Sequence, residues 1–264
     1  MNPWAVESLC TPACATDAAP RVSLGERVRR YASLTCALSR GVSVGGRLAE
    51  PGVLRTRARA VLRALGVRLE AGTEPLRVPG CAGGTGTLIV ANHISWLDVI
   101  SLLAVEPVAL LAKREVGRWP VIGTLARRSG TRFIDRDRVR ELPKVIESLA
   151  SMLHAGRSVM VFPQATTWCS VSGGRFRRAT FQAAVEAGAP VRPVTIDYYQ
   201  NGTPSTVAGF LGDEDFGASL RRVVGAGGLA ARVTAHRPLF GADRRTLAAE
   251  ARAAVSVSEL PAHA

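Results

Sequence analysis

The chain has 264 residues, 47% of them hydrophobic and 5% aromatic, which is enough to bury one large core with or without a helical appendage. Thirty-four Lys and Arg residues against 21 Asp and Glu give a net charge of +13, so we expect an anionic partner: nucleic acid, anionic lipid or a phosphorylated small molecule. Because aromatic residues are few and no helix-turn-helix is recognisable, nucleic acid is the least favoured of these, and we expect none.

Residues 1–20 are rich in Ala, Pro, Thr and Cys without periodicity, which predicts a disordered lead-in. They contain neither the basic nor the apolar region of a secretory signal. The chain's cysteines are odd in number, form no CxxC pair and have no nearby His to complete a metal set: Cys10, Cys14, Cys36, Cys81 and Cys169. We therefore expect reduced thiols in a cytosolic compartment and no metal site.

Residues 21–68 form a basic segment with eleven Arg and only two acidic residues. Its second half, "VLRTRARAVLRALG", has helical periodicity, with an apolar face beside a stripe formed by Arg55, Arg59 and Arg63. The apolar face contains Leu54, Ala58, Val61, Leu62 and Leu65. Two interpretations are open: a surface helix packed on the domain, or a membrane-associating helix with its Arg side chains on anionic headgroups.

Residues 69–258 are expected to form the main domain, in which short β-rich runs alternate with helices. Strands are predicted at 87–91, 108–112, 131–134, 158–162, 191–196 and 231–236, and helices at 95–104, 139–155, 179–187, 214–224 and 243–254. The alternation predicts an α/β fold with a mixed, mostly parallel sheet covered by helices. The longest apolar stretch, 99–112, is interrupted by Glu106 and Pro107 and is too short for a membrane span, so we expect no transmembrane helix.

The stretch "NHISWLD" begins where the predicted strand 87–91 ends, and Ser95 is a good N-cap for the helix that follows. His93 then belongs to the loop and Asp98 to the first helical turn, which lets the carboxylate fold back onto one imidazole nitrogen. The other nitrogen would be basic, which is the arrangement of a general base with its orienting group. A helix-terminal Asp beside an unrelated His is the alternative interpretation of this stretch alone.

Four blocks in order resemble those of the glycerolipid acyltransferases, the family of lysophosphatidate acyltransferase: "NHISWLD" (92–98), "RFIDR" (132–136), "VFPQATT" (161–167) and "APVRPVTI" (189–196). The resemblance covers roughly residues 55 to 255. It implies an O-acyltransferase that moves a fatty acyl group from a thioester of coenzyme A or acyl carrier protein to the hydroxyl of a lysolipid such as 1-acylglycerol-3-phosphate, and it implies no metal or bound cofactor.

The resemblance also implies roles for individual residues. His93 would be the general base and Asp98 would hold its tautomer, while Arg136, Gln164 and Thr166 would orient the acceptor headgroup. Substrates that stay in the bilayer imply a peripheral enzyme on the cytoplasmic face of the cell membrane, in contact with an anionic surface.

The third block departs from the family pattern, because Gln164, Ala165 and Thr167 stand where the family has Glu, Gly and Arg. Loss of the Arg removes an expected phosphate ligand. Arg178, with Arg175 and Arg177, is close enough in sequence to replace it. These departures leave two alternatives to a lysophosphatidate acyltransferase: an enzyme for another lysolipid, such as a zwitterionic or amino-acid-linked one, and a non-catalytic lipid-binding relative.

Overall fold

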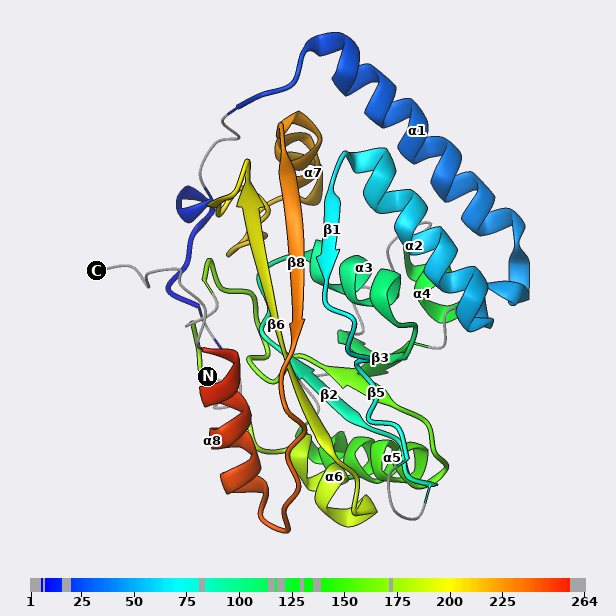
Figure 1. Cartoon of the computed structure of the whole chain (residues 1–264), viewed down its shortest axis with the longest axis vertical. Helices are drawn as coiled ribbons and strands as arrows, with labels where there is room; N and C mark the ends of the chain where they lie inside the picture. Colours follow the sequence, from blue (N-terminus) through cyan, green and yellow to red (C-terminus); the bar gives the residue numbers. More distant parts are fainter. Residues whose placement is uncertain are drawn as a thin grey trace.

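The computed structural model describes residues 6, 8–15, 20–80, 84–113, 117, 122–128, 131–134, 139–170 and 173–256. Over these residues the chain forms an eight-stranded sheet in the order β1-β8-β6-β2-β5-β3-β4, with β7 paired to β6 (Figure 1). The strands are β1 (Arg68–Ala71), β2 (Leu88–Ala91), β3 (Ala109–Lys113), β4 (Arg132–Ile134), β5 (Val159–Val161), β6 (Val191–Gln200), β7 (Thr203–Pro204) and β8 (Leu229–Ala235).

The middle of the sheet is parallel: β6, β2, β5, β3 and β4 run in one direction, and β8 is antiparallel to β6. The predicted mixed, mostly parallel sheet is therefore confirmed. All four residues of β2 are completely buried, as expected for a strand covered on both faces. Val90 lies beside both Val161 of β5 and Pro193 of β6, so β2 and β5 end at the same edge of the sheet.

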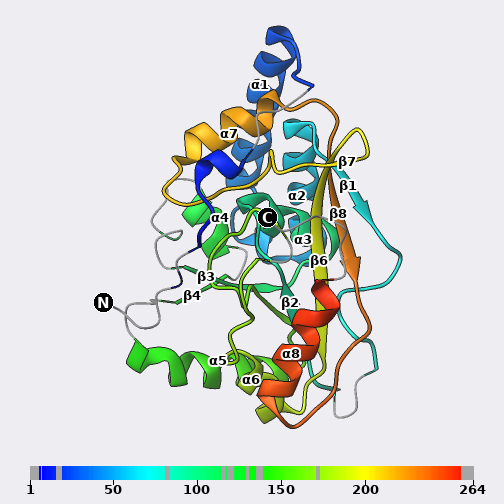
Figure 2. The same cartoon turned by 90° about the vertical axis from the view of Figure 1, so that its left-hand side faces the viewer.

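Eight α-helices occur in the described part of the chain. They are α1 (Leu24–Ser43), α2 (Pro51–Leu65), α3 (Trp96–Val105), α4 (Ile122–Arg128), α5 (Leu142–His154), α6 (Phe181–Ala187), α7 (Phe216–Gly225) and α8 (Arg244–Val255). Three short 3-10 helices accompany them: η1 (Pro12–Cys14), η2 (Gly45–Ala49) and η5 (Val139–Glu141). In Figure 2 the molecule is turned so that α1 and α7 lie at one end and α5, α6 and α8 at the other.

The basic segment forms two helices, with α1 packed on α2 and α2 packed on α3 (Figure 1). The apolar face predicted for α2 is buried at Leu54, Ala58, Leu62 and Leu65 and partly buried at Val61. The Arg59 Nε donates a hydrogen bond of 2.9 Å to the Ala104 carbonyl near the end of α3. For α2 the structure therefore agrees with the interpretation as a packed surface helix.

The amino-terminal region differs from the predicted disordered lead-in within residues 8–15. Pro12 to Cys14 form η1, and Cys10 is buried against Cys169 and Leu211. Small apolar side chains therefore give part of this segment a packed position that its composition did not indicate. Among the described residues, no helix combines the length and the apolar character needed to cross a membrane.

Candidate active site

The loop that leaves β2 is attached to the neighbouring strand by Asn92. This buried side chain donates from Nδ2 to the Ile196 carbonyl at 2.9 Å and accepts from the Ile196 N–H at 2.8 Å. The amide therefore replaces a strand partner for β6 at the point where β2 ends. His93 follows directly, so its backbone position is set by the sheet.

The expected contact between His93 and Asp98 is confirmed, with 2.8 Å between Nδ1 and Oδ2. Ser95 is the N-cap of α3, and Asp98 completes a capping box with it. The same Oδ2 accepts the backbone N–H groups of Ile94 at 2.7 Å and Ser95 at 2.9 Å. Because an ionised carboxylate only accepts, a neutral His93 ring paired with it carries its proton on Nδ1 and its lone pair on Nε2.

A third side chain, Tyr198 of β6, completes the surroundings of Asp98. Its hydroxyl donates to Oδ1 of Asp98 at 2.6 Å. Burial first, and then the charge and hydrogen bond of Asp98, raise the pKa of Tyr198 well above 10, so this hydroxyl keeps its proton. Tyr198 was not predicted as a site residue, because the predicted strand ended at residue 196 and no spacing rule relates Tyr198 to Asp98.

The imidazole of His93 is held between two elements. Its ring stacks on Phe162, with 4.1 Å between the ring centroids and 19° between their planes. Its backbone N–H donates to Gln164 Oε1 at 2.6 Å, and its carbonyl accepts from the Trp168 N–H at 2.8 Å. The His93 side chain remains 21% exposed, whereas that of Asp98 is fully buried, so only the imidazole of this pair is open to a substrate.

The third block forms the turn after β5 and differs from expectation at Gln164. This side chain is 1% exposed, and its Nε2 donates to the Gly173 carbonyl while Oε1 accepts from His93. Both ends of the amide are thus engaged within the protein instead of facing an acceptor headgroup. Ala165, at the family's Gly position, has a φ of +64°, in the left-handed region that favours glycine.

The other residues expected to orient the acceptor headgroup are not joined to His93 in the described structure. Arg136 lies outside the described residues. Thr166 is half-buried and Arg178 is exposed, and no hydrogen bond or ion pair joins either to His93 within the described structure. Arg177 is tied to the third block through its backbone N–H, which donates to the Pro163 carbonyl at 2.9 Å. The Thr167 hydroxyl donates to the Phe210 carbonyl.

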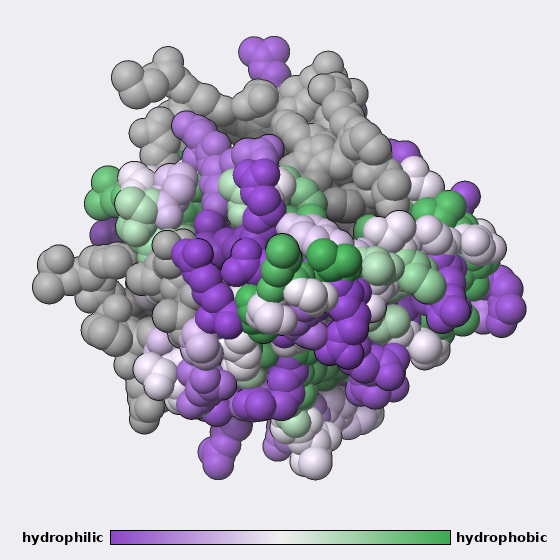
Figure 3. Space-filling view, turned by 90° about the horizontal axis from the view of Figure 1, so that it is seen from above, coloured by the Kyte–Doolittle hydropathy of each residue, from purple (hydrophilic) through white to green (hydrophobic). Residues whose placement is uncertain are grey.

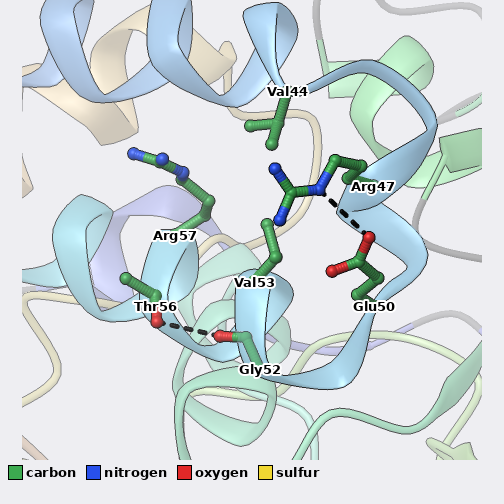
Figure 4. Close-up of a pocket in the computed structure, with 7 residues that line it drawn as sticks. All are labelled: Val44, Arg47, Glu50, Gly52, Val53, Thr56 and Arg57. Carbon is green, nitrogen blue, oxygen red and sulfur yellow. Dashed lines mark hydrogen bonds and ion pairs between the residues drawn. The ribbon is translucent and has the colours of Figure 1, made fainter.

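A separate pocket lies away from these residues, where the end of α1 turns through η2 into α2. Figure 4 shows that Arg47 and Arg57 line it from opposite sides, and Arg47 pairs with Glu50 at 3.1 Å. None of the candidate site residues lines this pocket. It belongs to the helical hairpin and not to the His93 site.

Comparison with known proteins identifies the family of the chain. A model of the Acyltransferase family matches residues 70–197, a range that contains His93, Asp98 and Gln164. The chain is 37% identical over 185 residues to the lyso-ornithine lipid O-acyltransferase of Pseudomonas aeruginosa, covering 69% of this chain and 71% of that protein. The chain therefore belongs to the acyltransferase family.

A further relative and a solved structure are also similar to the chain. The 1-acyl-sn-glycerol-3-phosphate acyltransferase of Neisseria gonorrhoeae is 33% identical over 212 residues, covering 77% of this chain and 80% of that protein. The crystal structure of the 1-acyl-sn-glycerophosphate acyltransferase PlsC from Thermotoga maritima aligns with a TM-score of 0.59 at 19% identity over 88% of this chain and 92% of that one, which shows a shared fold. The protein is an acyltransferase of the lysolipid type, and the non-catalytic alternative is set aside.

Proposed function

We propose that the protein transfers a fatty acyl group from a thioester of coenzyme A or acyl carrier protein to the hydroxyl of a lysolipid, with His93 as general base. The contact between His93 Nδ1 and Asp98 Oδ2 supports this assignment most directly, because it leaves Nε2 as the proton acceptor. A partly exposed imidazole paired with a buried carboxylate is the arrangement that such a base requires.

In the proposed reaction, Nε2 of His93 takes the proton of the acceptor hydroxyl while its oxygen attacks the thioester carbonyl carbon. The tetrahedral intermediate collapses as the carbon–sulfur bond breaks, and the imidazolium returns the proton to the leaving thiolate. An ester and a thiol are formed. Asp98 stabilises the imidazolium and keeps the ring in one tautomer, and Phe162 restricts its rotation.

Gln164 is assigned a positioning role in place of the headgroup contact expected from the family pattern. Its amide joins the backbone of His93 to the Gly173 carbonyl, so the turn after β5 and the turn after β2 hold each other in register. Such support limits the displacement of the base, and misplacement by about 1 Å can reduce an enzyme rate on the order of a hundredfold.

We propose an acceptor with an amino-acid-linked headgroup. Thr167 stands where the family has an Arg, and its hydroxyl is engaged with Phe210, so position 167 provides no bidentate phosphate ligand. The similarity to a protein named as a lyso-ornithine lipid acyltransferase points the same way. The Neisseria relatives, named for 1-acylglycerol-3-phosphate, represent the competing acceptor class.

The acceptor is tested with purified protein, a panel containing lyso-ornithine lipid and lysophosphatidate, and both thioester donors. The expected result is a kcat/KM at least about tenfold higher for the amino-acid-linked acceptor, since a site built for one headgroup discriminates against another. A strong preference for lysophosphatidate would contradict the headgroup assignment while leaving the reaction intact. Absence of transfer to every lysolipid would contradict the reaction itself.

We propose that the enzyme contacts its membrane peripherally through α1. Exposed apolar residues repeat at helical spacing along this helix, with Leu24 75% and Val28 62% exposed, followed by Tyr31 and Val42. Figure 3 views the molecule from the end that carries α1 and α7, where hydrophobic residues lie among hydrophilic ones. Because the apolar face of α2 is buried, we assign the membrane contact to α1 and not to α2.

A further inference from the structure

Three cysteines that are far apart in the sequence converge beside the third block. Cys10 and Cys14 belong to the amino-terminal segment, and Cys169 follows the turn that contains Gln164. Their Sγ atoms all lie within 4.8 Å of one another, and those of Cys10 and Cys169 are 3.3 Å apart. Because 159 residues separate Cys10 from Cys169, the spacing of cysteines in the sequence could not indicate this cluster.

The cluster is shielded on one side and open on the other. Cys10 is 8% and Cys169 4% exposed, packed with Leu211, whereas Cys14 is half-buried. The backbone N–H of Cys169 donates to Cys10 Sγ at 3.4 Å. Hydrogen-bond donors directed at sulfur commonly support thiolate ligands of a metal ion.

We propose that Cys10, Cys14 and Cys169 bind a thiophilic divalent metal ion, for which Zn²⁺ is the representative, through their three sulfur atoms. Tetrahedral Zn²⁺ with Zn–S bonds of about 2.3 Å separates its sulfurs by about 3.8 Å, which is compatible with a cluster whose sulfurs span 3.3 to 4.8 Å. A disulfide would use only two of the sulfurs. Water takes the fourth position on the open side near Cys14.

The bound ion connects the amino-terminal segment to the support of the catalytic base. Trp168, the residue before Cys169, donates its backbone N–H to the His93 carbonyl at 2.8 Å. A metal that fixes residue 169 to residues 10 and 14 thus stiffens the turn on which His93 rests. The ion would be structural, since no step of the proposed reaction uses it.

The test uses the full-length protein without a histidine tag, purified under reducing conditions and stripped with a chelator. Zn²⁺ is titrated in competition with a chromophoric chelator, and Co²⁺ is added separately to detect the near-ultraviolet thiolate-to-cobalt absorption. The expected result is one ion per chain, with that absorption band. Cys14→Ser and Cys169→Ser should each weaken binding at least about tenfold. Cys36→Ser, an exposed cysteine on α1, is the matched control and should bind as the wild type does.

Three outcomes would overturn the proposal. The first is absence of metal binding in protein whose thiols all react with a thiol reagent, which would make the cluster a packed group of small apolar side chains. The second is a pair of results: mass spectrometry finds a Cys10–Cys169 disulfide in protein prepared without reductant, and the reduced protein binds no metal. The third is unchanged stoichiometry and affinity in both Cys14→Ser and Cys169→Ser, with circular dichroism confirming that each variant is folded.

Discussion

Asp98 is the residue on which the site is organised, because its two oxygens accept from four donors. Oδ2 receives His93 Nδ1 and two backbone N–H groups, and Oδ1 receives the Tyr198 hydroxyl. The carboxylate is completely buried, so each donor replaces a water molecule that the folded chain excludes. Loss of one donor should therefore affect both stability and the orientation of His93.

Tyr198→Phe tests this arrangement by removing one hydroxyl from a buried ring. We expect the free energy of unfolding to fall by about 1–3 kcal/mol, because an oxygen of a buried carboxylate loses its donor. The kcat should fall about tenfold with a smaller change in KM, since Tyr198 acts through Asp98. Tyr199→Phe, its neighbour on β6, is the control. Equal kcat and equal urea midpoints for both variants would argue against the role of Tyr198.

Gln164→Glu restores the family's residue and should nevertheless be harmful here. A carboxylate can still accept from the His93 N–H, but it cannot donate to the Gly173 carbonyl and would place a negative oxygen against it. We expect a loss of about 1–3 kcal/mol in urea unfolding and a lower kcat/KM. Wild-type values for both quantities would show that the amide is not needed at this position.

His236 gives the molecule a pH dependence unrelated to catalysis. Its Nε2 lies 2.7 Å from Thr195 Oγ1, and burial lowers its pKa below the ordinary 6.5. The unfolded chain therefore binds a proton more readily than the folded chain, so this contribution to stability is complete above pH 6.5 and is lost as the pH falls below it. Urea midpoints from pH 7.5 to 5.5 should decline less in His236→Gln than in the wild type. Parallel curves would contradict this prediction.

Site residues that lie close together in one turn were predictable from the sequence, whereas those supplied by distant parts of the chain were not. His93 and Asp98 are five residues apart, and the strand-to-helix turn between them was predictable from "TLIVA" and Ser95. Tyr198 reaches Asp98 across 100 residues, and Gln164 reaches His93 across 71. The motif identified Gln164 as important, but only its burial and its bond to Gly173 reveal that it supports the loop.

At the scale of elements, the site exists because adjacent parallel strands end together. The six predicted strands are all present, because each is a short run rich in strand-forming residues. The carboxyl ends of β2 and β5 carry His93 and Gln164. Strand β1 was not predicted, since "RLEA" is polar and depends on β8 for its conformation. Helix α4 and the two-residue strand β7 were also not predicted. The two residues of β7 are too few to show a strand pattern.

The exposed apolar residues of α1 predict a membrane contact that can be measured. Replacing Leu24, Val28 and Tyr31 together by Ser should reduce sedimentation with anionic liposomes at least about tenfold, because each large apolar side chain contributes about 1.5–3 kcal/mol when buried. Phe240→Ser, which removes another exposed hydrophobic residue outside α1, is the control. Unchanged binding of the triple variant would assign the contact to another surface.

At the scale of the whole molecule, the excess of Arg and the buried sheet have different roles in the proposed acyl transfer at a membrane. The net charge of +13 has the sign needed to attract the chain to the anionic membrane surface proposed above, whereas the sheet holds His93 and Asp98 in a fixed relation. The fold shared with the Thermotoga maritima enzyme at 19% identity indicates that the architecture tolerates extensive change in sequence. The proposed mechanism requires that the imidazole of His93 removes the proton of the acceptor hydroxyl.

The most direct test is kcat/KM for acyl transfer by His93→Ala, measured with the best acceptor and donor of the panel. The account predicts a loss on the order of 10²–10⁴-fold, the usual contribution of a positioned general base, with unchanged liposome binding and a wild-type circular dichroism spectrum. His154→Ala, which removes an exposed imidazole at the end of α5, should retain wild-type kcat/KM. Near-normal transfer by folded His93→Ala would contradict the mechanism.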